Sequence, residues 1–116
     1  MGNDKTRFSQ QTNPIRTVEE LYSTYDFVNS FTVADSTTDY DLKAQQSTAF
    51  KNVKRAWLAL IWTDQAISIK LNSTSNPAIA VGLNESPFEL RNIFNVSNIY
   101  ITNASGSAAS IKVMLV

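Results

Sequence analysis

The sequence of 116 residues contains no cysteine and no histidine. Without cysteine there is no disulfide framework, no thiolate nucleophile and no cysteine-based zinc site. Without histidine the chain lacks the commonest general base and the commonest transition-metal ligand. Only carboxylates remain for acid–base chemistry, so we expect a protein that is not an enzyme and that uses no cofactor and no metal.

Charge is also scarce. Charged residues make up 17% of the chain, against about a quarter in an average protein. Ten Lys and Arg residues balance ten Asp and Glu residues, which argues against nucleic acid as a partner. No apolar run approaches the ~20 residues of a membrane span, and the opening MGNDKTRFSQQTNP lacks the apolar region of a signal peptide. We expect no membrane partner and synthesis in the host cytoplasm.

The first residues show no strand pattern. Residues 1–16 are polar and aperiodic, which indicates an extended arm. Thr17 and Glu20 have the spacing of a capping box, and the apolar residues that follow repeat at helical spacing. We therefore predict a short helix over residues 17–27, closed by Asn29. The arm and the helix together form a predicted N-terminal region, residues 1–29.

From residue 30 the apolar period changes to two. About eight short alternating segments follow, separated by turn-rich pieces such as ADSTTD, NSTSNP and NASGSA. This spacing predicts an all-β domain over residues 30–116, an antiparallel β-sandwich that is jelly-roll-like. In IFNVSNIYIT the alternation shifts phase, which predicts a β-bulge near Ser97–Asn98.

One predicted strand, RAWLALIWT at residues 55–63, is apolar at both parities. A strand with one wet face should alternate instead. Either both faces are covered within one chain, for example by the helix over residues 17–27, or one face lies in a subunit interface. Tryptophan is favoured in both settings, and the pattern leaves the choice open.

Several weaker motifs have simple explanations. Asp35, Asp39 and Asp41 could hold calcium or act as a glycosidase pair, but we favour a solvated turn. A myristoylation pattern at Gly2 is short and matches often by chance. The chain also contains four N-glycosylation sequons, which we attribute to chance in an Asn- and Ser-rich composition. They begin at Asn72, Asn84, Asn95 and Asn103.

The aromatic residues could form a platform on which sugars stack, although aromatics at strand spacing are more often core residues. The candidates are Tyr22, Tyr25, Tyr40, Trp57, Trp62 and Tyr100. A carbohydrate-binding or receptor-binding module is therefore the alternative function.

The segments TDQAISIKLN, SPFEL and NIYITNASGSAASIKVML carry a resemblance. Over residues 63–116 the chain resembles small structural proteins of tailed-bacteriophage virions, of the capsid-decoration, head-fibre or tail-adaptor type. The resemblance implies a virion location and a non-enzymatic role in binding other virion proteins. It also makes a homo-oligomer, first of all a trimer, the expected state.

A structural role of this kind needs contact surfaces. We expect them on the arm, on the apolar strand and at the apolar end of the chain, where a second subunit would cover the last strand. The residues concerned are Arg7, Phe8, Ile15, Trp57, Leu58, Leu60, Trp62, Leu115 and Val116.

Overall fold

The computed structural model describes residues 25–116. These residues form eight strands, a one-turn α-helix and one turn of 3₁₀ helix. In chain order the elements are β1 (Asp26–Val33), β2 (Thr37–Asp41), α2 (Leu42–Gln45), β3 (Ala56–Thr63), β4 (Ile67–Leu71), β5 (Ile79–Val81), η2 (Leu83–Glu85), β6 (Phe88–Val96), β7 (Ile99–Asn103) and β8 (Ala109–Leu115).

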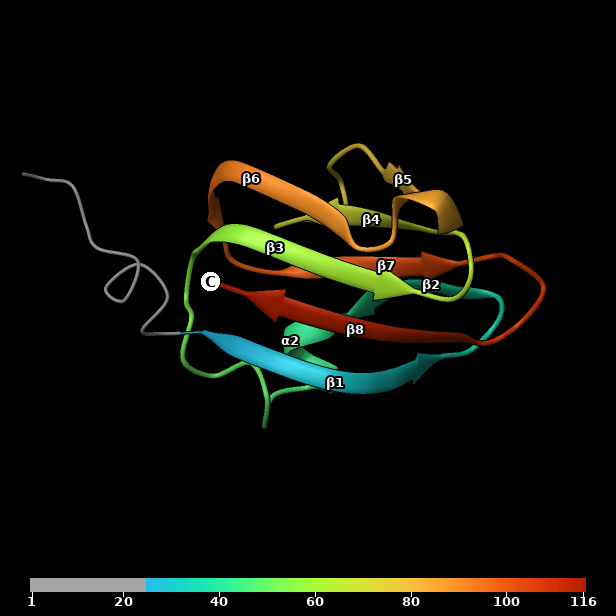
Figure 1. Ribbon diagram of the computed structural model, residues 1–116, viewed down its shortest axis with the longest axis horizontal. Helices are drawn as coiled ribbons and strands as arrows, with labels where there is room; N and C mark the ends of the chain where they lie inside the picture. Colours follow the sequence, from blue (N-terminus) through green and yellow to red (C-terminus); the bar gives the residue numbers. More distant parts are fainter. Residues whose placement is uncertain (1–24) are drawn as a thin grey trace, which may run out of the picture.

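The strands form two four-stranded antiparallel sheets that lie face to face (Figure 1). The strand orders are β1-β8-β3-β6 and β2-β7-β4-β5. Successive strands thus alternate between the sheets except for β4 and β5, which form a hairpin within one sheet. This order is that of two interlocked Greek keys, which is the jelly-roll arrangement. The predicted all-β, jelly-roll-like sandwich of about eight strands is confirmed.

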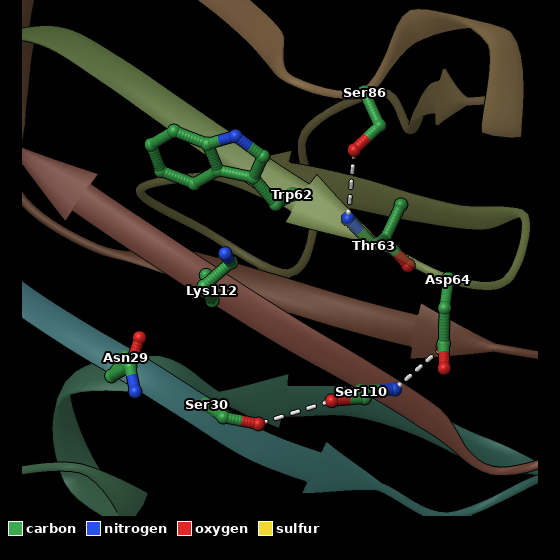
Figure 2. Close-up of a pocket in the computed structure, with 8 residues that line it drawn as sticks. All are labelled: Asn29, Ser30, Trp62, Thr63, Asp64, Ser86, Ser110 and Lys112. Carbon is green, nitrogen blue, oxygen red and sulfur yellow. Dashed lines mark hydrogen bonds between the residues drawn. The ribbon is translucent and has the colours of Figure 1, made fainter.

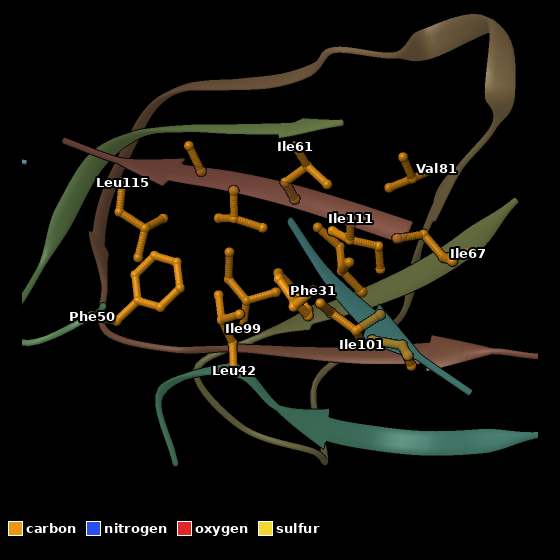
Figure 3. Close-up of a cluster of buried hydrophobic side chains, with 14 of the residues drawn as sticks. Phe31, Leu42, Phe50, Ile61, Ile67, Val81, Ile99, Ile101, Ile111 and Leu115 are labelled. Carbon is orange, nitrogen blue, oxygen red and sulfur yellow. The ribbon is translucent and has the colours of Figure 1, made fainter. Parts of the chain in front are cut away.

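Alternation along the strands places the core between the two sheets. In β8, Ala109, Ile111 and Val113 are buried while Ser110 and Lys112 between them are exposed. β1 and β2 contribute an aromatic pair, Phe31 and Tyr40, whose rings stack with centroids 5.6 Å apart. The buried side chains of both sheets meet in one cluster (Figure 3).

The phase shift in IFNVSNIYIT has a different cause from the one predicted. Ser97 and Asn98 belong to neither strand, although the pairing of β6 with β3 changes register just before them, between Arg91 and Val96. β6 ends at Val96 and β7 begins at Ile99, and the two strands belong to different sheets. Ser97 and Asn98 carry the chain from one sheet to the other, so Val96 and Ile99 both enter the shared core from opposite sides.

The predicted helix over residues 17–27 is wrong at its C-terminal end. Asp26 and Phe27 already belong to β1, where they pair with Leu115 and Met114 of β8. Pairing with a central strand outweighs a short-range helical pattern of marginal stability. The sandwich therefore starts at Asp26, four residues before the expected boundary, and Asn29 lies within β1. Residues 17–24 of the predicted helix, like the arm, lie outside the described residues.

The apolar end of the chain is covered by the chain itself. β8 lies between β1 and β3, so Leu115 is fully buried and Val116 is 7% exposed. The backbone N–H of Val116 donates to the carbonyl oxygen of Leu58 at 3.0 Å. Leu115 and Val116 are therefore covered by neighbouring strands of the same chain, and no second subunit is needed to bury them; their place in an interface stays a prediction.

Candidate functional site

The doubly apolar strand β3 contains a β-bulge at Trp57 and Leu58. The backbone N–H groups of both residues donate to the carbonyl oxygen of Val116, at 2.8 and 3.4 Å. Trp57 and Leu58 of β3 thus both lie opposite the single residue Val116, which is the pattern of a β-bulge. Trp57 and Leu58 consequently lie on the same side of the sheet, and the parity of the strand changes between them.

The bulge settles which residues of β3 enter the core. Ala56, Ala59 and Ile61 are fully buried. Trp57 is 56% exposed, and Leu58, Leu60 and Trp62 are half-buried on the outer side of the sheet. Neither tryptophan is a core residue, although strict alternation along the strand would place Trp57 on the same face as Ala59 and Ile61.

The outer face continues across three strands. Met114 of β8 is paired with Leu60 of β3 on one side and with Phe27 of β1 on the other. Partners in a ladder point to the same face of a sheet, so the three side chains form one row. Phe27 also meets the ring of Trp62 edge-on, with centroids 6.4 Å apart.

We name this surface the outer patch, formed by Phe27, Trp57, Leu58, Leu60, Trp62 and Met114. Figure 1 shows the β1-β8-β3-β6 sheet in front of the second sheet, with no helix or strand of residues 25–116 lying over it. Phe27 and Trp57 are among the large apolar side chains that remain exposed. Contiguous apolar patches of this kind typically mark contact sites on protein surfaces.

Beside the outer patch the same face becomes polar and concave. A hollow of about 500 Å³ lies where β1, β8 and β3 run together with the segment after η2 (Figure 2). We name it the polar hollow, and it is lined by Asn29, Ser30, Trp62, Thr63, Asp64, Ser86, Ser110 and Lys112. Trp62 is the boundary residue, since it belongs to both surfaces.

Hydrogen bonds hold the walls of the polar hollow. The Ser30 and Ser110 hydroxyl oxygens lie 3.0 Å apart, and Asp64 Oδ1 accepts from the Ser110 N–H at 2.7 Å. Ser86 Oγ accepts from the Thr63 N–H at 3.2 Å. Lys112 Nζ lies 5.5 Å from the centroid of the Trp62 ring, within cation–π range. Neither ion pair found among residues 25–116 includes Lys112 or Asp64.

The structure brings together four of the predicted interface residues. Trp57, Leu58, Leu60 and Trp62 all lie on the outer patch. Arg7, Phe8 and Ile15 lie outside the described residues. Sequence reasoning did not find Phe27 and Met114, because only strand register places them beside β3.

The three aspartates do not converge on one point. Asp35 accepts from the Gly106 N–H at 2.9 Å, and Asp39 forms an ion pair with Lys70 at 3.2 Å. Asp41 caps α2 by accepting from the Ala44 N–H at 3.1 Å. In the part of the chain that the structure describes, no three His, Cys, Asp or Glu side chains are grouped as metal ligands would be.

Two of the four sequon asparagines have structural roles. Asn103 is fully buried, and its Nδ2 donates to the carbonyl oxygens of Val33 and Ser107. Asn72 Nδ2 donates to the Asn95 carbonyl oxygen at 3.1 Å, and its Oδ1 accepts from the Ser97 N–H at 2.7 Å. Glycosylation at either Nδ2 would disrupt these contacts.

The aromatic residues do not form one platform. Tyr40 packs against the core and stacks on Phe31. Tyr100 belongs to β7 in the other sheet. Trp57 and Trp62 share the outer face of the first sheet, Tyr25 is exposed next to β1, and Tyr22 lies outside the described residues.

Sequence reasoning also missed a buried polar anchor. Asp26 is 2% exposed, and its carboxylate accepts from the N–H groups of Asn52 and Val53, at 3.0 and 2.7 Å. Lys43 Nζ donates to the Val53 carbonyl oxygen at 2.7 Å. Partial burial lowers the pKa of Lys43 below its ordinary value of 10.5, against the opposing effect of Asp26. Together these groups attach the segment before β3 to β1 and α2.

Comparisons with protein-family models, with curated proteins and with solved structures find no match for this chain. The helices of residues 25–116 are all too short to cross a membrane.

Proposed function

We propose that this chain is a non-enzymatic structural subunit of a bacteriophage virion, which binds neighbouring virion proteins and further copies of itself. The outer patch is the observation that carries the proposal. It presents two indoles, a phenyl ring and three aliphatic side chains on one sheet face. Surfaces of this composition are typical of the centres of protein interfaces.

Three further features support the proposal. Jelly rolls are common among viral capsid domains. The resemblance of residues 63–116 to virion structural proteins also favours a virion role. The chain also carries no net charge, so copies do not repel one another at long range.

The partner on the outer patch is a second copy of the chain. The patch is a sheet face rather than a groove, and two sheet faces stack well at about 10 Å. Self-association would cover Trp57 and Phe27 on both copies at once. Contact between the same patch on two copies closes as a two-fold dimer, so the trimer expected from the resemblance would need a second, different contact surface.

The test is the native mass of a charge-substituted variant. Trp57→Lys places a charge in the outer patch and should lower the native mass to that of a monomer, measured by analytical ultracentrifugation. Leu83→Lys is the matched control, because Leu83 is 55% exposed, close to the 56% of Trp57, but lies in η2. The control should keep the mass of the unsubstituted chain.

Equal masses for both variants would contradict self-association through this patch. The virion assignment is tested separately, by mass spectrometry of purified phage particles. Peptides of this chain should be present in stoichiometric amounts, and their absence from intact particles would overturn the assignment.

A further inference from the structure

The polar hollow differs in chemistry from the outer patch beside it. Its volume of about 500 Å³ lies within the range of small-ligand sites. Its only aromatic surface is the Trp62 ring, and no aliphatic side chain lines it. An apolar ligand would therefore find one flat surface and otherwise only polar walls.

The polar groups supply donors and acceptors in similar measure. Lys112 can only donate, the Asp64 carboxylate can only accept, and the serine hydroxyls can do both. Figure 2 shows the Trp62 ring at one end of the hollow with Lys112 beside it, while Asp64, Ser86 and Ser110 lie toward the other end. A ligand rich in hydroxyl groups can satisfy both kinds of partner at once. A phosphate or carboxylate ligand would be attracted by Lys112 but repelled by Asp64, so the hollow has no net charge that favours an anion.

The walls are in place before a ligand binds. Asp64 Oδ1 is already held by the Ser110 N–H, and Ser86 Oγ by the Thr63 N–H. Ser86 accepts in that bond, which leaves its hydroxyl hydrogen able to donate. The rings of Phe27 and Trp62 pack perpendicular to each other, and Lys112 Nζ lies over the Trp62 ring, so both contacts hold the indole. A preorganised site loses less conformational entropy on binding.

From these features we propose that the polar hollow is a binding site for a neutral sugar ring, such as the hexose of a cell-surface glycan. The apolar face of the ring packs on Trp62, and its hydroxyl groups bond Asp64, Lys112 and Ser86. This binding activity goes beyond the proposed assembly role, and it requires that a partner on the outer patch leaves the Trp62 ring accessible.

The test uses the fluorescence of Trp62 in a Trp57→Phe background. The chain has two tryptophans, so this background makes Trp62 the sole indole reporter. Free glucose, galactose and mannose and their disaccharides are titrated, with inorganic phosphate as the charged comparison. We expect a saturable change with at least one neutral sugar, at dissociation constants in the millimolar range typical of such a small contact.

Asp64→Asn should weaken that binding at least tenfold. Asp35→Asn is the matched control, since Asp35 also accepts a backbone N–H, from Gly106, but lies outside the hollow. Asp64→Asn should leave the native mass unchanged, so loss of sugar binding is distinguishable from loss of assembly. No saturable change with any neutral sugar, an equal effect of the two substitutions, or tighter binding of phosphate would overturn the proposal.

Discussion

At the scale of single residues, a few polar side chains determine how the loops attach to the sandwich. Asp26 holds two backbone N–H groups of the segment before β3, and Lys43 holds a carbonyl oxygen of the same segment. Buried polar groups are tolerated only when they are paired in this way. Asn103 has the same role between β1 and the turn before β8.

Lys43 makes stability depend on alkaline pH. Burial lowers its pKa in the folded chain below the ordinary 10.5, so the unfolded chain binds more protons as the pH approaches that value. Stability rises with pH wherever the unfolded state binds more protons. The free energy of unfolding should therefore gain a positive contribution from Lys43 as the pH is raised toward 10.5.

Urea unfolding at a series of pH values measures this contribution. The unsubstituted chain should gain stability relative to Lys43→Met as the pH rises. Lys51→Met, at an exposed position, is the control and should show no such trend. If the difference in the free energy of unfolding between the unsubstituted chain and Lys43→Met stays constant or shrinks as the pH rises, the lowered pKa of Lys43 is contradicted.

At the scale of the element, β3 shows how one bulge converts a uniformly apolar strand into two distinct faces. Beyond the bulge the strand alternates strictly, with Ala59 and Ile61 inside and Leu60 and Trp62 outside. The strand needs apolar residues on both faces because one packs against the second sheet and the other forms the outer patch.

Adjacent residues of β3 should differ sharply in their effect on folding. Ile61→Ala empties space in the core and should lower the free energy of unfolding by about 2–5 kcal/mol. Leu60→Ala, on the half-buried outer face, should cost about 1 kcal/mol. Chemical denaturation in the Trp57→Lys background measures both values, since assembly then does not contribute. If Leu60→Ala lowers the free energy of unfolding as much as Ile61→Ala or more, the assignment of Ile61 to the core and Leu60 to the outer face is wrong.

At the scale of the whole molecule, residues 25–116 form two sheets that share one core. The core draws on residues from Phe31 to Leu115, and β1 is paired from Asp26 onward. Residues 1–16 contain almost no apolar side chains. We expect such a polar arm to act between subunits rather than within the core.

Deleting residues 1–16 should leave the melting temperature of the sandwich nearly unchanged and reduce the stability of the assembly. Circular dichroism measures the first quantity, and the dilution at which the native mass falls measures the second. Replacing the arm with a Gly and Ser segment of equal length controls for chain length. If the shortened chain assembles as stably as the full one, the arm has no linking role.

The sequence by itself determined the fold class, because alternation with a period of two places apolar residues on one face of a strand wherever it pairs. It also indicated that β3 was unusual. It could not determine which residues of β3 face outward, since the bulge depends on Val116, more than fifty residues away. Nor could it join Phe27, Leu60 and Met114 or assemble the polar hollow, because strand register between distant segments placed those side chains together. Tertiary pairing likewise decided that Asp26 begins a strand and that Leu115, the last residue of the central strand β8, is buried.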